Sequence, residues 1–161
     1  MEGLWVFLFG FSLKMLFFHI FIYGYLWLLC FAPVIYQPKR ILSSPYALGL
    51  ALPGLILIRK ETCHDRILAH EFVHQQQMRR WTPIGCAIFL GYHYIGGFLQ
   101  QLRTRRPLSF YTLYQSNPLE IEANTGTTIP NLPKLSLLHL RLWFLMHISV
   151  ISFVIVVLYL T

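Results

Sequence analysis

The chain has 161 residues, of which 56% are hydrophobic and 16% aromatic, while only 12% carry a formal charge. Soluble proteins contain roughly 25% charged residues, so this composition excludes an ordinary soluble domain and favours a membrane protein. The net charge of +7 is compatible with nucleic-acid binding, but basic residues beside apolar spans also set membrane orientation and contact anionic lipids. We therefore expect the lipid bilayer as a partner, and no nucleic acid.

The N-terminal segment is apolar from Leu4 to Ile35 and is interrupted by Lys14. Residues 15–35 are long enough to span a bilayer as one helix. A cleaved signal peptide is the alternative, but the apolar run is too long and no small-x-small cleavage pattern follows it. The sequence therefore predicts a retained N-terminal membrane anchor over residues 1–36.

The C-terminal segment contains a second apolar run, residues 142–160, without any formal charge. This length covers the hydrocarbon core of a bilayer, and Ser136 is a suitable N-cap, so we expect a transmembrane helix within residues 136–161. All lysine and arginine residues except Lys14 and Arg141 lie between the two predicted spans. The positive-inside rule then places residues 37–135 in the cytoplasm and both termini outside.

The first half of this middle region predicts a strand followed by a helix. Residues 53–60, PGLILIRK, are typical of a short strand, and an extended peptide substrate could pair with its edge. Thr62 and Asp65 resemble a capping box that opens a helix from about residue 63 to residue 81. Thr82-Pro83 ends that helix and starts the next one.

Two further helices are expected in the second half of the middle region. Residues 84–99 are apolar and have basic residues on both sides, so this helix either packs within the domain or lies in the membrane interface. A short helix is expected within residues 115–126, with Asn117 as the N-cap, Pro118 at the first position and Gly126 at the end.

The decamer LAHEFVHQQQ, residues 68–77, contains candidate metal-binding and catalytic residues. On a helix, His70 and His74 lie on one face, which suits zinc because this metal takes neutral histidine nitrogens in a tetrahedral set. Glu71 lies beside such a metal and can take a proton from a metal-bound water. The alternative is that both histidines and Glu71 only form the polar face of an amphipathic helix.

A zinc site of this kind needs a third protein ligand. The three cysteines are Cys30, Cys63 and Cys86, and they form neither a C-x-x-C pair nor an even set, which argues against disulfides and cysteine-based zinc sites. The acidic pair Glu120 and Glu122 is the best source. Glu120 could instead close a capping box as the third helical residue, so both glutamates remain candidates.

HEFVH followed by EIEAN resembles the gluzincin class of zinc metallopeptidases, including the membrane-bound heat-shock protease and the prenyl-protein-processing protease families. This resemblance covers residues 54–126. It implies that Glu120 is the metal ligand and that Ala123 permits close helix contact. Asn124 stands where the class usually has an aspartate that orients a ligand histidine, and its uncharged carbonyl oxygen would do so more weakly.

Other polar side chains have less specific interpretations. Gln75, Gln76 and Gln77 are expected to form a polar helix face, and His93, flanked by aromatic residues, is expected to pack. Tyr111 and Tyr114 precede the second motif, and either could stabilise an oxyanion or pack at the membrane interface.

The prediction is a mainly α membrane protein with a minimal zincin-like helical domain, residues 37–135, that contains a short β-strand and is flanked by two transmembrane helices. Its predicted function is that of a zinc metalloendopeptidase acting on peptides or membrane proteins. The metal ligands are His70, His74 and Glu120, the cofactor is Zn²⁺, and Glu71 is the general base. The alternative is a non-catalytic metal-binding membrane protein, either a pseudoprotease or an assembly subunit.

Overall fold

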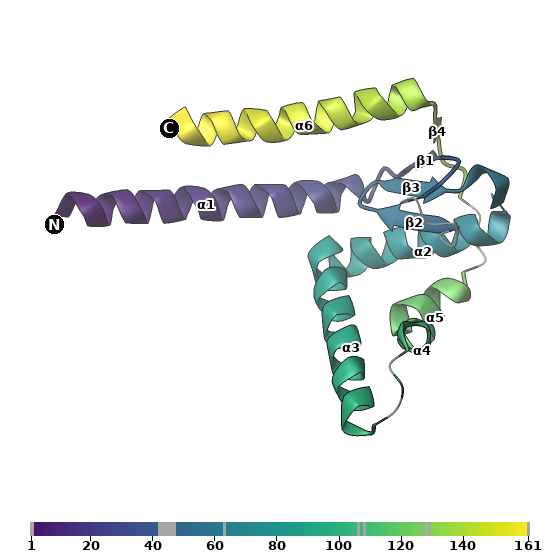
Figure 1. Cartoon of the computed structure of the whole chain (residues 1–161). Coiled ribbons are helices and arrows are strands. Elements are labelled where there is room, and N and C mark those ends of the chain that lie inside the picture. The colour runs from purple at the N-terminus through teal and green to yellow at the C-terminus, as the bar shows by residue number, and fades with distance from the viewer. Residues whose placement is uncertain are drawn as a thin grey trace.

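The computed structural model describes residues 2–41, 48–62, 64–105, 107, 109–126, 128 and 130–160, and their side chains except those of residues 2–12, 62 and 159. The chain is mainly helical with a small β-sheet, and two long helices extend away from the sheet (Figure 1). The predicted fold class is confirmed at this level.

The first long helix, α1 (Glu2–Leu29), is followed by a short strand, β1 (Val34–Tyr36). The expectation of one helix over residues 15–35 is therefore wrong, and the last residues of the predicted anchor belong to the sheet. Pro33 gives the physical reason, because the residue before a proline is disfavoured in the helical conformation, and the β-branched residues that follow fit a strand.

The sheet has four strands in the order β2-β3-β1-β4, where β2 is Gly49–Leu52, β3 is Leu55–Ile58 and β4 is Lys134–Leu135. Strands β2 and β3 form an antiparallel hairpin, and β1 is parallel to both β3 and β4. The hairpin turns at Pro53-Gly54, where Gly54 has a φ of 74° that glycine adopts without a steric cost.

The predicted strand within residues 53–60 is confirmed as β3. However, β3 lies between β2 and β1, so both of its edges are paired. The hypothesis that β3 offers an edge to a peptide substrate is therefore wrong. Among the described strands, β2 is the outer strand on the β3 side of the sheet, and it lies beside helix α2.

Helix α2 (Asp65–Trp81) packs between the sheet and the short helix α5 (Figure 1). A 3-10 turn, η1 (Lys60–Thr62), precedes it. The predicted capping box is wrong, because the N-cap is His64, whose side chain makes no capping hydrogen bond. The apolar core between the sheet and α2 includes Ile56, Ile58 and Leu68.

Helix α3 (Pro83–Arg103) begins directly after α2. The prediction that Thr82 caps it is confirmed, since the Thr82 hydroxyl oxygen accepts from the backbone N–H of Gly85 at 3.1 Å. Thr82 has a φ of 62°, a rare conformation for a residue other than glycine. At this corner the chain changes direction, and α3 runs away from α1 and α6, roughly perpendicular to both (Figure 1).

Two short helices follow, α4 (Phe110–Gln115) and α5 (Pro118–Asn124). The prediction for α5 is confirmed, because Asn117 is its N-cap and accepts from the backbone N–H of Leu119. The chain then returns to the sheet through β4 and enters the second long helix, α6 (Leu137–Leu160), after Ser136, which accepts from the backbone N–H of His139 as the predicted N-cap.

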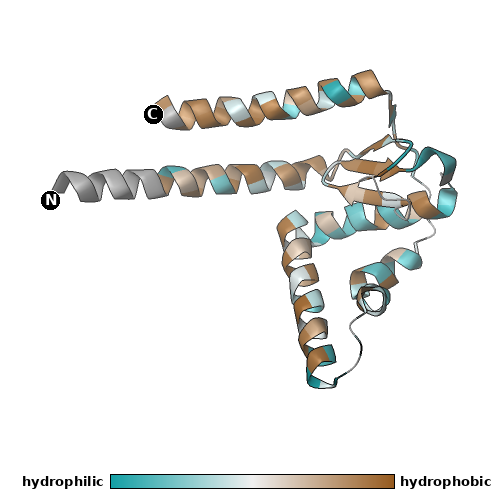
Figure 2. Ribbon diagram, viewed as in Figure 1, coloured by the Kyte–Doolittle hydropathy of each residue, from teal (hydrophilic) through white to brown (hydrophobic). Residues whose placement is uncertain are grey.

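Helices α1 and α6 lie side by side and run antiparallel (Figure 1). A hydrogen bond joins the Tyr25 hydroxyl group and Nδ1 of His147 across the pair. Among the described residues, α6 is long and apolar enough to cross a membrane over Leu137–Leu158, while Leu13–Leu29 of α1 form a shorter apolar helix. The hydropathy colours show both helices as largely apolar where described (Figure 2).

Candidate metal centre

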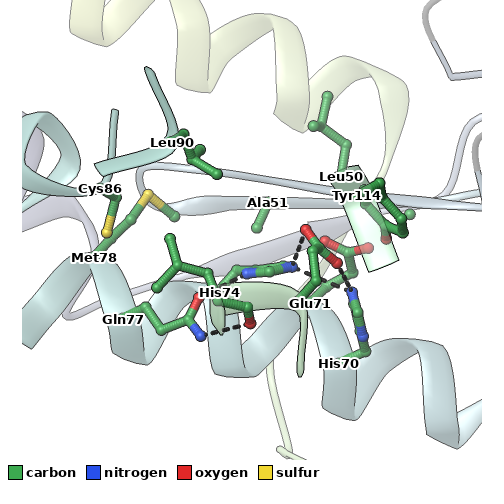
Figure 3. A pocket seen from close by; sticks show the side chains of 13 residues that line it. Leu50, Ala51, His70, Glu71, His74, Gln77, Met78, Cys86, Leu90 and Tyr114 are labelled. Atoms are coloured by element: carbon green, nitrogen blue, oxygen red, sulfur yellow. Dashed lines mark hydrogen bonds and ion pairs between the residues drawn. The ribbon is translucent and has the colours of Figure 1, made fainter. Parts of the chain in front are cut away.

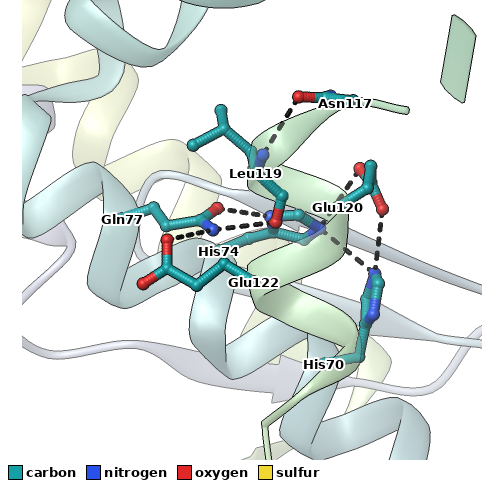
Figure 4. Close-up of polar contacts among 7 residues, drawn as sticks. All are labelled: His70, His74, Gln77, Asn117, Leu119, Glu120 and Glu122. Carbon is teal, nitrogen blue, oxygen red and sulfur yellow. Dashed lines mark hydrogen bonds and ion pairs between the residues drawn. The ribbon is translucent and has the colours of Figure 1, made fainter. Parts of the chain in front are cut away.

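Three side chains from two helices converge beside the sheet. His70 and His74 are one turn apart on α2, and their Nε2 atoms are 3.2 Å from each other. Glu120, in the first turn of α5, places one carboxylate oxygen 3.3 Å from Nε2 of His70 and the other 3.4 Å from Nε2 of His74. Figure 4 shows the two rings and the carboxylate directed toward one point.

The structure thus distinguishes the two glutamates that the sequence left open. Glu122 points elsewhere: its carboxylate accepts from Arg80 at 2.7 Å and from the Gln77 side chain at 3.0 Å. Glu120 does not act as a capping-box residue, because its carboxylate is directed at the two histidines.

The spacing of the two Nε2 atoms and the Glu120 carboxylate fits a zinc ion. Two ligands of a tetrahedral zinc that each lie about 2.0–2.2 Å from the metal are about 3.3 Å apart. The 3.2 Å between the two Nε2 atoms corresponds to one edge of such a tetrahedron, and each carboxylate oxygen of Glu120 lies at a similar distance, 3.3 or 3.4 Å, from one of these nitrogens. Two histidines and one carboxylate leave the fourth position open, which is the ligand set of a catalytic zinc rather than a structural one.

The orientation of His74 is fixed by Gln77. Nδ1–H of His74 donates to the side-chain carbonyl oxygen of Gln77 at 2.8 Å, and the Gln77 amide donates in turn to the Leu119 carbonyl at 2.9 Å. With Nδ1–H held in this way, the neutral ring would present an unprotonated Nε2 to a metal bound beside Glu120 and His70. A hydrogen bond of this kind sets the tautomer of a metal ligand and raises its basicity.

Two sequence interpretations are corrected at this point. Asn124, expected to orient a ligand histidine, is exposed at the end of α5, and Gln77 takes that role for His74. The three glutamines do not share one polar face: Gln75 and Gln77 are buried and only Gln76 is exposed. Gln75 accepts from the Gly54 backbone N–H and donates to the Leu52 carbonyl, which ties the β2–β3 hairpin to α2.

Glu71 is buried between α2 and β2. Gly49 makes this placement possible, because a Cβ atom at position 49 would lie 2.3 Å from Oε1 of Glu71. Burial raises the pKa of the Glu71 carboxyl, against the opposing effect of His74 and His70, while a backbone hydrogen bond from Ala51 favours the ionised form. A raised pKa brings a carboxylate closer to the range in which it both takes and returns a proton.

Tyr114 of α4 completes the polar group around Glu120. Burial raises the pKa of Tyr114, and its hydrogen bond to Glu120 raises it further, so the hydroxyl keeps its proton. Burial opposes ionisation of Glu120, but the hydrogen bonds from His70, His74 and Tyr114 are stronger and lower the pKa of this carboxyl. Tyr111, the other tyrosine singled out from the sequence, is 73% exposed.

Two cavities meet at the candidate metal centre and share Gly49, His70, Glu71 and Tyr114 in their walls. The wall of the first is largely apolar and includes Leu50 and Ala51 of β2, Met78 of α2, and Cys86 and Leu90 of α3 (Figure 3). The second cavity is bounded by Arg66, Tyr111 and Asn124, among others. The candidate metal centre therefore lies at the junction of the two cavities.

His93, expected to pack, lies outside the cluster. Its Nε2–H donates to the Leu113 carbonyl at 2.9 Å and joins α3 to α4.

No family model matches the chain, and no curated protein and no solved structure matches it. The assignment of the site consequently depends on its geometry and chemistry.

Metal content tests the ligand set. We expect wild-type protein, purified in detergent, to hold about one zinc per chain, and His74→Ala and Glu120→Gln to lose it, because each removes one of three protein ligands. Glu122→Gln is the matched control, and it should retain zinc because Glu122 faces Arg80 and Gln77. Elemental mass spectrometry measures the ratio; zinc lost from Glu122→Gln and kept by Glu120→Gln would contradict the assignment.

Zinc affinity tests the role of Gln77. Gln77→Met keeps the volume but removes the acceptor for Nδ1–H of His74, so we expect zinc affinity to fall about 10–100-fold. Asn124→Ala is the control and should bind zinc as the wild type does, because Asn124 contributes no orienting hydrogen bond. Competition with a fluorescent chelator gives both affinities, and a loss for Asn124→Ala alone would restore the original sequence interpretation.

Proposed function

We propose that this chain is a membrane-anchored zinc metallopeptidase with a minimal zincin-like domain. The observation that carries the proposal is the convergence of His70, His74 and Glu120, whose ligand atoms all lie within 4.8 Å of one another, with the buried carboxylate of Glu71 beside them. The resemblance of HEFVH and EIEAN to the gluzincin class agrees with this arrangement residue by residue, except at Asn124.

The residues have distinct roles in this proposal. His70, His74 and Glu120 hold the metal, which when bound supplies a water of lowered pKa and polarises a carbonyl oxygen. Glu71 takes the proton of the attacking water and returns it to the amine that leaves when the peptide bond breaks. Tyr114 keeps its hydroxyl proton and lines both cavities, and in this proposal its hydrogen bond would pass from Glu120 to the developing oxyanion.

Strand β2 is the element best placed to hold the substrate. Gly49 and Ala51 of β2 lie directly against Glu71, and an extended peptide that pairs with an outer strand acquires main-chain hydrogen bonds. Such a peptide would pass over α2 between the two cavities. The apolar wall of the first cavity then favours an apolar side chain next to the scissile bond.

Activity of a Glu71 variant separates catalysis from metal binding alone. We expect Glu71→Gln to keep zinc but to lose about 10²–10⁴-fold of its hydrolytic rate, because the amide cannot accept the proton. Glu61→Gln is the matched control, since Glu61 is 68% exposed in its ion pair with Arg59 and lines neither cavity. The assay is cleavage of a fluorescence-quenched peptide library by the detergent-purified chain.

The alternative function gives a different result in this assay. A pseudoprotease or assembly subunit would bind zinc, yet wild type and Glu71→Gln would be equally inactive on every peptide pool. Equal, measurable activity in both proteins would instead show that Glu71 is not the base.

We further propose that both α1 and α6 cross the membrane and that the metal centre lies on the cytoplasmic side. The antiparallel pairing of the two helices and the concentration of basic residues between them support this topology. After bacterial expression, we expect alkaline phosphatase fused behind residue 161 to be active and green fluorescent protein at the same place to be dark. The same reporters fused behind Arg105 should behave in the opposite way; a fluorescent fusion at residue 161 would reverse the topology.

A further inference from the structure

Helix α3 has two faces of opposite character. Cys86, Leu90, His93 and Gly97 follow each other at intervals of three or four residues and face the domain: Cys86 and Leu90 line the first cavity, and the other two contact Leu113 of α4. The opposite face is formed by residues that are each at least half exposed, namely Ile88, Tyr92, Ile95, Leu99 and Leu102.

The angular positions of these residues make the separation clear. At about 100° per residue, the five exposed side chains fall within a sector of roughly 80°, centred about 180° from the domain-facing set. Their exposed fractions are 67, 80, 64, 58 and 51% in chain order. No polar side chain interrupts this sector, whereas a helix that faces water carries its charged and polar residues there.

The structure indicates what covers this face. Helices α4 and α5 lie on one side of α3, and α1 and α6 extend toward the other side, with α3 beginning beside the domain end of α1 and running roughly perpendicular to both long helices (Figure 1). The apolar outer face of α3 therefore adjoins the domain end of α1, which is apolar and pairs with α6 (Figure 2). Among the residues that the structure describes, none packs over this sector.

The ends of α3 have the residues of a membrane interface. Trp81, half exposed, precedes the helix, and Arg103 and Arg105 are exposed at and just after its last turn. Aromatic rings favour the headgroup level of a bilayer, and arginine side chains bind its anionic headgroups. Amphipathic helices with such flanks lie in the plane of the membrane, with the apolar face among the acyl chains.

We propose that α3 is an in-plane membrane helix whose outer face, Ile88, Tyr92, Ile95, Leu99 and Leu102, rests in the lipid at the surface from which α1 and α6 leave the domain. This contact is independent of the proposed catalysis, since it uses no residue of the metal centre. It has a consequence for that centre, however. Because Cys86 and Leu90 on the opposite side of the same helix line the apolar cavity, the cavity is one helix diameter from the lipid.

The substrate class follows from this distance. A peptide bond that reaches Glu71 lies close to the bilayer, so the proposal favours segments of membrane proteins directly next to a transmembrane span over long soluble polypeptides. This last step rests on the proposed function; the lipid contact itself does not.

Photocrosslinking tests the lipid contact directly. The full chain is placed in nanodiscs of three parts phosphatidylcholine to one part phosphatidylglycerol, with p-benzoylphenylalanine encoded at Tyr92 or, in a second variant, at Leu99. Both side chains are exposed, so neither replacement disturbs packing. Leu145 of α6, 58% exposed, is the position that should contact lipid, and Ile121 of α5, 52% exposed, is the matched apolar position that should not.

We expect intact-mass spectra to show the addition of one phospholipid at Tyr92 and Leu99 at the level seen for Leu145, and about tenfold or more above Ile121. Yields equal to that of Ile121, while Leu145 is labelled, would overturn the proposal. A crosslink between two copies of the chain at Tyr92 would also overturn it, because a second copy would then cover the face. Zinc and activity do not enter the readout, so a chain without peptidase activity can still pass this test.

Discussion

Burial of polar side chains along α2 is the constraint on which the arrangement of the other elements depends. A polar group removed from water costs free energy unless it finds a partner, and each buried polar residue of α2 finds one on a different segment. Glu71 is bonded by Ala51 of β2, Gln75 holds the β2–β3 hairpin and Gln77 holds α5. Arg79 donates to the Cys30 carbonyl just after α1. The helix that carries the site is thus also the one that organises the domain.

This arrangement couples the fold to the candidate metal centre. Gln77 bonds both His74 and the Leu119 carbonyl, so the position of α5, and with it Glu120, depends on the same side chain that sets the tautomer of a ligand. The carboxylate and the two rings converge in a largely apolar surrounding, where attraction between unlike charges is less screened than in water. A divalent cation at this point would neutralise Glu120, whose low pKa keeps it ionised.

The sequence predicted those parts of the molecule that depend on local signals. The i, i+4 histidines, the Thr82-Pro83 corner, the Asn117 cap and strand β3 were all readable from spacing and capping chemistry. The end of α1 was not, because an apolar run alone does not distinguish a helix from a buried strand, although Pro33 was a usable signal. The burial of Gln75 and Gln77 could not be read from three identical residues, since it depends on which elements surround α2. For the same reason, spacing alone did not reveal that Gln77 rather than Asn124 orients His74.

The two faces of α3 connect the proposed lipid contact with the proposed catalytic site. A small domain has little apolar core, and here α3 gives one face to the cavity while five large side chains remain outside it. In water that outer face would be a liability for aggregation, whereas at a bilayer surface it contributes apolar burial and fixes the tilt of the domain. In the proposed arrangement, α1 and α6 cross the membrane and α3 lies in its plane, and three helices in two orientations would hold the domain more rigidly than the pair alone. Under these two proposals, the fold would set the height of the metal centre above the lipid, and only peptide segments that reach this height would be substrates.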